Sequence, residues 1–201
     1  MPSIRELQIK RCMKDAWTNN YRPRKRRVSP KDAVYYNIDA RIINFTETVL
    51  RQYGTAVTPS EGVVYWAGRQ SGDRYFITAA VAPATVTSRY GFSTSHTANA
   101  RYVEFICDND LVHIAQVHSH PGSWVDHSPV DDGQTAFRSA GLVSIVVPNF
   151  SAEGMLPVKL WGVHRYEGGK FNRLSDKYAK ERFIITAGEL NQIITKDFRY
   201  E

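Results

Sequence analysis

The sequence lacks an apolar run long enough to cross a membrane. A membrane-spanning helix needs about 20 consecutive apolar residues, and no segment of this 201-residue chain approaches that length. The N-terminus is polar and charged, without the apolar core that a secretion signal carries. We therefore expect a soluble, cytoplasmic protein that has no membrane partner.

Cysteine is scarce, with Cys12 and Cys107 as its two occurrences. Their spacing matches neither a zinc clip nor a disulfide framework. Free thiols are the expectation, which agrees with a reducing compartment. The sequence also lacks internal repeats and low-complexity tracts, and 42% of its residues are hydrophobic, so we expect one domain with a substantial core.

Acidic residues are rare at the start of the chain. Residues 1–31 contain ten lysines and arginines against two acidic residues, a net charge of +8, and this leaves −2 for the other 170 residues. The formal charge of +6 therefore belongs to an N-terminal arm. This arm is either a solvated tether or a patch that binds an anionic surface or RNA.

The chain divides into three expected parts: a basic arm over residues 1–30, a central domain over 31–174 and a C-terminal helical segment over 175–201. Hydrophobic periodicity and turn residues predict the elements. Helices are expected over 3–18, from about 29 to 54, over 97–107, from 129 to about 140 and over 176–198. Strands are expected as a hairpin over 62–68 and 74–81, singly over 111–117 and 142–147, and as a second hairpin over 158–166 and 170–174, with a polar connection over 83–95.

The run from His118 to Asp131 has the residue types of a catalytic metal site. Side chains alternate between the faces of a strand, so His118 and His120 point to one side and can share an ion. His113 points to the other side if the strand is regular. The tetrapeptide that begins at Ser128 has the pattern of a helix start, with serine as N-cap and proline at the first helical position. This geometry can bring the Asp131 carboxylate back toward the two histidines.

Catalytic zinc typically has three protein ligands and one open position. His118, His120 and Asp131 make up that number, and Asp126 and Asp132 compete with Asp131 for the third place. Zinc makes a hydroxide nucleophile available near neutral pH, so a metal-dependent hydrolase is the expected class. Such a reaction also needs a general base, and no residue next to the histidines obviously supplies it.

The arrangement H-x-H-P-x(6)-S-x-x-D over residues 118–131 resembles the signature of the JAMM (JAB/MPN/Mov34-type) zinc metalloproteases. Glu61, with Gly68 seven residues later, is similar to the upstream part of that pattern. The resemblance covers about residues 30–166. It implies an α/β (α+β) fold of the MPN/JAB-like, cytidine-deaminase-like type, in which helices flank a mixed central sheet, and it makes residues 31–174 the JAMM/MPN catalytic domain.

The resemblance also implies a role for each residue of the motif. His118, His120 and Asp131 are the expected Zn²⁺ ligands, Glu61 the general acid/base, and Ser128 the group that stabilises the oxyanion. Glu104 is also upstream of the histidines, and the family pattern alone separates it from Glu61. Three residues between the histidines and Ser128 are particular to this chain and could shape substrate entry: Trp124, Asp126 and His127.

Members of this family that have an intact site cleave peptide or isopeptide bonds after the C-terminal glycine of ubiquitin or ubiquitin-like proteins. The expected partner is therefore a ubiquitin-like protein or its conjugate, together with a partner protein of a conjugation system, and nucleic acid is not an expected partner. Two alternatives stay open. One is an MPN-type scaffold or binding subunit, and the other is a nucleic-acid-linked hydrolase that uses the basic arm.

Overall fold

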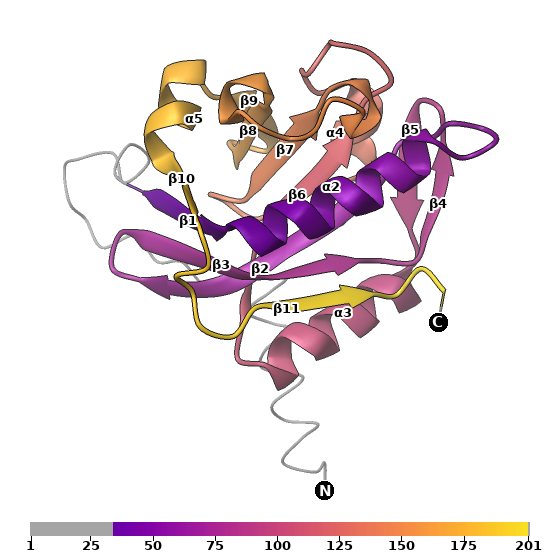
Figure 1. Cartoon of the computed structure of the whole chain (residues 1–201). Coiled ribbons are helices and arrows are strands. Elements are labelled where there is room, and N and C mark those ends of the chain that lie inside the picture. Colours follow the sequence, from indigo (N-terminus) through magenta and orange to yellow (C-terminus); the bar gives the residue numbers. More distant parts are fainter. Residues whose placement is uncertain (1–33, 201) are drawn as a thin grey trace, which may run out of the picture.

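The computed structural model describes residues 34–200, so the expectations for the basic arm and for a helix over 3–18 lie outside the described residues. A nine-stranded mixed sheet forms the centre, in the order β10-β1-β3-β2-β6-β7-β8-β9, with β11 also paired to β3 (Figure 1). β4 and β5 form a separate two-stranded sheet. This is the predicted α/β class, with a mixed sheet flanked by helices.

The elements have these bounds. The strands are β1 (Tyr35–Asp39), β2 (Val63–Ser71), β3 (Arg74–Ala82), β4 (Thr85–Ser88), β5 (Gly91–Thr94), β6 (Val112–Ser119), β7 (Val143–Val147), β8 (Gly162–Glu167), β9 (Lys170–Arg173), β10 (Phe183–Thr186) and β11 (Ile194–Asp197). The helices are α2 (Ala40–Gly54), α3 (His96–Asp108), α4 (Pro129–Gln134) and α5 (Asp176–Arg182), with short 3-10 turns η2 (Asn149–Ser151) and η3 (Val158–Leu160).

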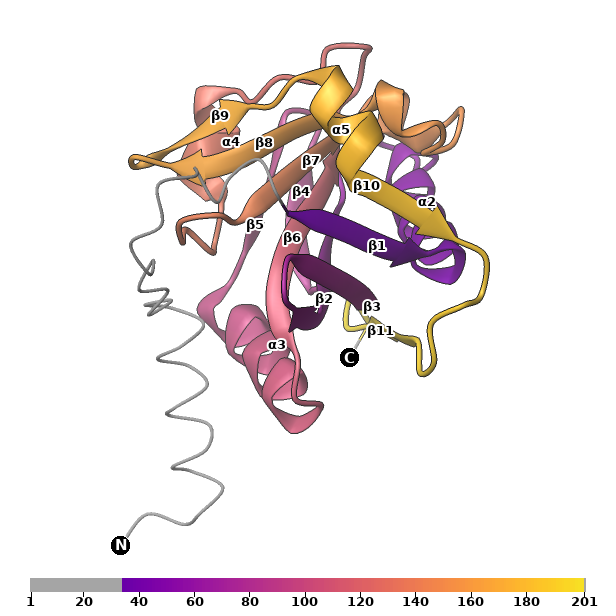
Figure 2. The same ribbon diagram turned by 90° about the vertical axis from the view of Figure 1, so that its left-hand side faces the viewer.

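Helices cover both faces of the sheet, α2 on one side and α3 on the other (Figure 2). α2 contributes Ile42 and Leu50 to an apolar cluster that also contains Trp66 of β2. On the opposite face, Tyr102 of α3 and Phe92 of β5 belong to a second cluster. Each helix therefore buries one apolar stripe against the sheet, which is how helices of this type are stabilised.

The predicted helix from about 29 to 54 is wrong in its first part. Tyr35–Asp39 is a strand that pairs in parallel with β3 and β10, and the helix begins at Ala40. Tyr36 and Ile38 are apolar at a spacing of two, and partners far away in the sequence decide that this segment is a strand. Asp39 is the N-cap. Hydrogen bonds from Arg41 outweigh burial and lower the pKa of Asp39 to about 2.

Strand β6 contains a bulge that the sequence does not indicate. Its register to β2 pairs Ala115 with Trp66 and His113 with Ala67, so Ile114 is the extra residue. Ile114 and Ala115 both lie in the α2-side cluster. His113 instead lies among the rings of the α3-side cluster, with its Nδ1 2.7 Å from the Tyr102 hydroxyl. The prediction that His113 lies on the face opposite to the other two histidines is therefore wrong.

The predicted C-terminal helix over 176–198 is correct only to Arg182. Strands β10 and β11 follow it, and they join the sheet beside β1 and β3. The predicted polar connection over 83–95 contains the β4–β5 hairpin. The helix from residue 129 ends at Gln134, short of residue 140, and contains Gly133, a residue that disfavours helix. The first hairpin, α3, β6 and β7 are confirmed. The second hairpin is also confirmed, but its first strand begins at Gly162, because residues 158–160 form η3.

Cys107 is disulfide-bonded. The prediction of a free thiol is therefore wrong at this position, because spacing in the sequence does not report which sulfur atoms the fold brings together. The argument from cysteine usage to a reducing compartment no longer holds. No helix within residues 34–200 is long and apolar enough to cross a membrane.

Candidate metal centre

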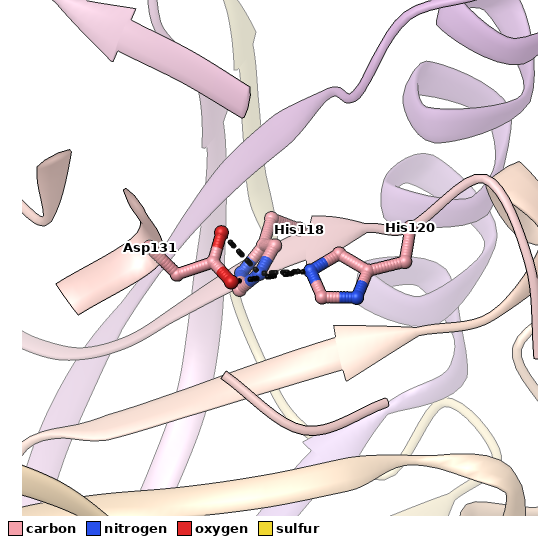
Figure 3. A group of neighbouring side chains, drawn as sticks. All are labelled: His118, His120 and Asp131. Atoms are coloured by element: carbon pink, nitrogen blue, oxygen red, sulfur yellow. Dashed lines mark hydrogen bonds and ion pairs between the residues drawn. The ribbon is translucent and has the colours of Figure 1, made fainter. Parts of the chain in front are cut away.

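Three side chains converge beside the end of β6 (Figure 3). The Nε2 atoms of His118 and His120 are 3.2 Å apart. The carboxylate oxygens of Asp131, in the first turn of α4, lie 3.6 Å from Nε2 of His118 and 3.4 Å from Nε2 of His120. All three residues are buried, and together they form a group that can hold a metal ion.

These atoms lie close enough together to share one metal ion. The two Nε2 atoms are 3.2 Å apart, and each lies near a different oxygen of the Asp131 carboxylate, Oδ1 for His118 and Oδ2 for His120. Two imidazoles and one carboxylate are a donor set that suits a divalent transition metal, zinc among them.

The orientation of His120 is set by the loop that follows it. Its Nδ1 lies 3.0 Å from the carbonyl oxygen of Trp124. A carbonyl oxygen only accepts, so Nδ1 donates the hydrogen bond and Nε2 carries the lone pair that a metal needs. The Trp124 indole stacks on the His120 ring with centroids 5.3 Å apart. Both contacts hold the ring in the geometry for ligation.

The carboxylate of Asp131 is oriented by a capping box. The backbone N–H of Ser128 donates to its Oδ2 at 2.6 Å, and the Ser128 hydroxyl accepts from the Asp131 N–H at 3.1 Å. Burial alone raises the pKa of Asp131, but the hydrogen bond from His120, the electrostatic interaction with His118 and the contacts with Ser128 outweigh it and lower this pKa. Asp131 is therefore ionised, the form that binds a cation.

The two histidines differ in their protonation. Burial lowers the pKa of His118 well below its usual value, so its ring is neutral, as a ligand must be. Burial also lowers the pKa of His120, but Asp131 and Glu61 outweigh burial and raise it. Two carboxylates thus concentrate negative potential at His120, where a bound cation takes the place of the proton.

Glu61 lies just before β2 and lines a cavity of about 320 Å³ beside the ligands, together with Tyr90, His120, Pro121, Gly122, Trp124 and Ser128. Its backbone N–H donates to the carbonyl of Ser88 at 2.8 Å, which ties this segment to the β4–β5 hairpin. The side chain is 4% exposed, and burial, with His120 opposing it, raises its pKa to about 7. Its Oε2 has no hydrogen-bond partner among the described residues.

Of the five predicted site residues, Glu61, His120 and Ser128 line the cavity, and His118 and Asp131 lie beside it in the ligand group. The competing residues lie elsewhere. Glu104 is exposed on α3. Asp126 pairs with Arg173 at 2.8 Å, and Asp132 pairs with His127 at 2.9 Å, so neither carboxylate joins the ligand group. His113 also lies outside that group, because it is near the other end of β6, where its Nδ1 contacts the Tyr102 hydroxyl.

Sequence reasoning missed three residues around the centre. Tyr90, in the turn between β4 and β5, lines the cavity and is 71% exposed. Gln116 and Ser144 are buried on β6 and β7 and hydrogen-bond to each other. The sequence contains an indication for Gln116, because it is a polar residue two positions before His118 on a mostly apolar strand. Tyr90 had none, because the hairpin that presents it was not predicted.

No protein-family model matches the chain. A 97-residue segment is 32% identical to "Probable metalloprotease y4jG" of Sinorhizobium fredii, a match that covers 46% of this chain and 59% of that protein. The fold is similar to the solution structure of protein DSY2949 from Desulfitobacterium hafniense. The TM-score is 0.57 at 17% identity, over 76% of this chain and 93% of that one. The first likeness is to a protein named as a metalloprotease, and the second shows the fold.

Proposed function

We propose that this protein is a zinc-dependent peptidase of the JAMM type. The observation that carries the proposal is the placement of Glu61, a buried carboxylate with a free oxygen, in the same cavity as His120 and Ser128. The metal-ligand group and the sequence relative named as a probable metalloprotease support the same class.

The residues of the cavity divide the chemistry between them. His118, His120 and Asp131 would hold Zn²⁺, which, when bound, supplies Lewis acidity and a hydroxide nucleophile at neutral pH. Glu61, with its pKa raised to about 7, can take a proton from the attacking water and return it to the leaving nitrogen. Ser128 sits at the cavity wall, where its hydroxyl can donate to the oxyanion of the tetrahedral intermediate.

The proposed substrate is a ubiquitin-like protein or its conjugate, cut after its C-terminal glycine, with a conjugation-system protein as a further partner. A cavity of about 320 Å³ is at the small end of ligand pockets and suits residues with small side chains. The resemblance of residues 118–131 to the JAMM signature supports the same choice.

Glu61→Gln tests the role of the base. We expect kcat for cleavage of ubiquitin-like fusion proteins to fall about 10²–10⁴-fold, the contribution of a positioned general base, while the zinc content of the purified protein stays at that of the wild type. Glu104→Gln is the matched control, because that glutamate is exposed on α3.

Each other outcome counts against part of the proposal. Full activity of Glu61→Gln would remove Glu61 from the mechanism. A wild-type protein that takes up no zinc and cleaves no fusion after zinc is added would favour the scaffold or binding subunit instead. Cleavage that a chelator does not inhibit would contradict a metal-dependent reaction.

A further inference from the structure

A chain of hydrogen bonds among buried side chains lies beside His118, and the backbone of α4 closes it into a ring. None of its side chains lines the cavity. The ring joins strands β6 and β7, the loop before α4 and α4 itself. Its side chains are Gln116, His127, Asp132, Thr135 and Ser144. All except Asp132 are buried side chains, and the apolar residues of the α3-side cluster surround this region.

The chemistry of each group fixes the direction of every bond on one side of the ring. The Asp132 carboxylate only accepts, so Nδ1 of His127 donates to it at 2.9 Å. Nε2 of the neutral ring then accepts from the Ser144 hydroxyl at 2.8 Å. The oxygen of Ser144 in turn accepts from the Gln116 amide at 3.1 Å.

The other side of the ring ends on a metal ligand. The same amide nitrogen of Gln116 donates to the hydroxyl oxygen of Thr135 at 3.1 Å. The Thr135 hydroxyl donates to the backbone carbonyl of Asp131 at 2.8 Å. The two N–H groups of the Gln116 amide therefore have one acceptor each, and none of the side-chain atoms that form these bonds is left without a partner.

The ring stabilises α4, a helix that is too short to be stable by itself. α4 has six residues, and a helix of this length is not stable without tertiary contacts. The capping box of Ser128 fixes its first turn, and the ring attaches its remaining length to β6 and β7. Gln116 lies two residues before His118 on the same strand, so the ring connects the segment that carries one ligand to the helix that carries another.

We propose that Gln116, His127 and Ser144 are positioning residues of the metal centre, which keep Asp131 at ligand distance from His118 and His120 before a metal binds. The inference rests on the metal site of the proposed function and is independent of the peptidase reaction. A positioning role predicts a loss of zinc affinity when these side chains are replaced. A purely structural role does not, because for folding alone well-packed apolar groups can replace a buried polar network at little cost.

The test measures zinc affinity and fold stability separately. Gln116→Met removes both amide donors and keeps a side chain of similar length, and Ser144→Ala removes the link between His127 and Gln116. Tyr65→Phe is the matched control: it breaks a buried hydrogen bond to Asn99 on the same face of the sheet and lies outside the ring. The readouts are the zinc Kd from competition with a chromophoric chelator, the visible spectrum of the Co²⁺-loaded protein and the Tm of the metal-free protein.

We expect Gln116→Met and Ser144→Ala to raise the zinc Kd about 10–100-fold, the usual cost of losing the groups that orient metal ligands. Their Co²⁺ spectra should change, while the Tm of the metal-free protein falls no further than in Tyr65→Phe. A zinc Kd that changes by the same factor in all three variants would overturn the inference. A wild-type protein that binds no zinc would overturn the metal site as well. Tight zinc binding that is lost in the two ring variants supports the inference even if no fusion protein is cleaved.

Discussion

The two histidines of the metal centre lie two residues apart at the end of β6 and have opposite surroundings. His120 faces the cavity, where Glu61 and Trp124 share its wall. His118 is completely buried, and its ring lies against Phe92 and His127. The side of the centre that faces the cavity, the open side, therefore carries the groups that can meet a substrate. The buried side around His118, the closed side, carries groups that hold the ligands in place.

The difference follows from the hydrogen bonds of each ring. On the open side, one backbone carbonyl fixes His120 through Nδ1. On the closed side, Nδ1 of His118 has no partner among the described residues, so packing and the contacts of Nε2 with the other two ligands orient that ring. A ligand held by packing depends on the core around it, whereas a ligand held by a hydrogen bond depends on one loop. Substitutions on the two sides should therefore differ in their effect on the free energy of unfolding.

The largest contrast is expected between His118→Ala and His120→Ala. Both variants should lose stoichiometric zinc and hydrolytic activity, because each removes one of three ligands. His118→Ala should also lower the free energy of unfolding of the metal-free protein by about 2–4 kcal/mol, since it leaves a cavity in a packed interior. His120→Ala, at the cavity wall, should change it by less than about 1 kcal/mol. Denaturant unfolding with a chelator present measures this, and equal losses would contradict the distinction between the two sides.

A smaller effect is expected from Gly162→Ala, at the start of β8. A methyl group at this position would lie 1.7 Å from the carbonyl oxygen of Val125, in the loop between Trp124 and His127. The loop must move to admit it, and such overpacking costs about 1–3 kcal/mol. Because this loop serves both sides of the centre, we expect zinc affinity to fall as well. Gly72→Ala, in an open turn, is unsuitable as a control because its φ is +60°. Ala67→Gly is the control, because it alters the same sheet and adds no side-chain atoms.

Local chemistry explains which parts of the centre could be predicted from sequence. The N-cap of α4, the position of Asp131 and the shared face of His118 and His120 depend on spacings of two to four residues, and the structure has all three. Glu61 is different, because it lies 57 residues before His118 and only the resemblance to a family connected it with the ligands.

Two of the misses share one physical cause, which is pairing between segments that are distant in the sequence. Tyr35–Asp39 is a strand because β3 and β10 flank it, and the β6 bulge at Ile114 exists only in relation to β2. Gly68 shows the same dependence: a Cβ there would lie 1.9 Å from the carbonyl of Phe76 on β3, so the glycine is required by the neighbouring strand. Strand parity fails at a bulge, which is why His113 was placed on the wrong face.

The smallest effect should come from Trp124→Ala, which alters the open side alone. The indole stacks on His120 and is 54% exposed at the cavity, whereas the hydrogen bond to His120 comes from the backbone carbonyl, which alanine retains. An aromatic contact of this kind contributes about 0.5–1.5 kcal/mol, so we expect KM for fusion substrates to rise about 2–10-fold while the zinc content and Tm stay near those of the wild type. Trp124→Phe should recover most of the loss. If zinc binding fell as far as in the Gln116→Met variant, the stacking of Trp124 on His120 would be as important for metal binding as the buried hydrogen bonds, and the division between the two sides would be wrong.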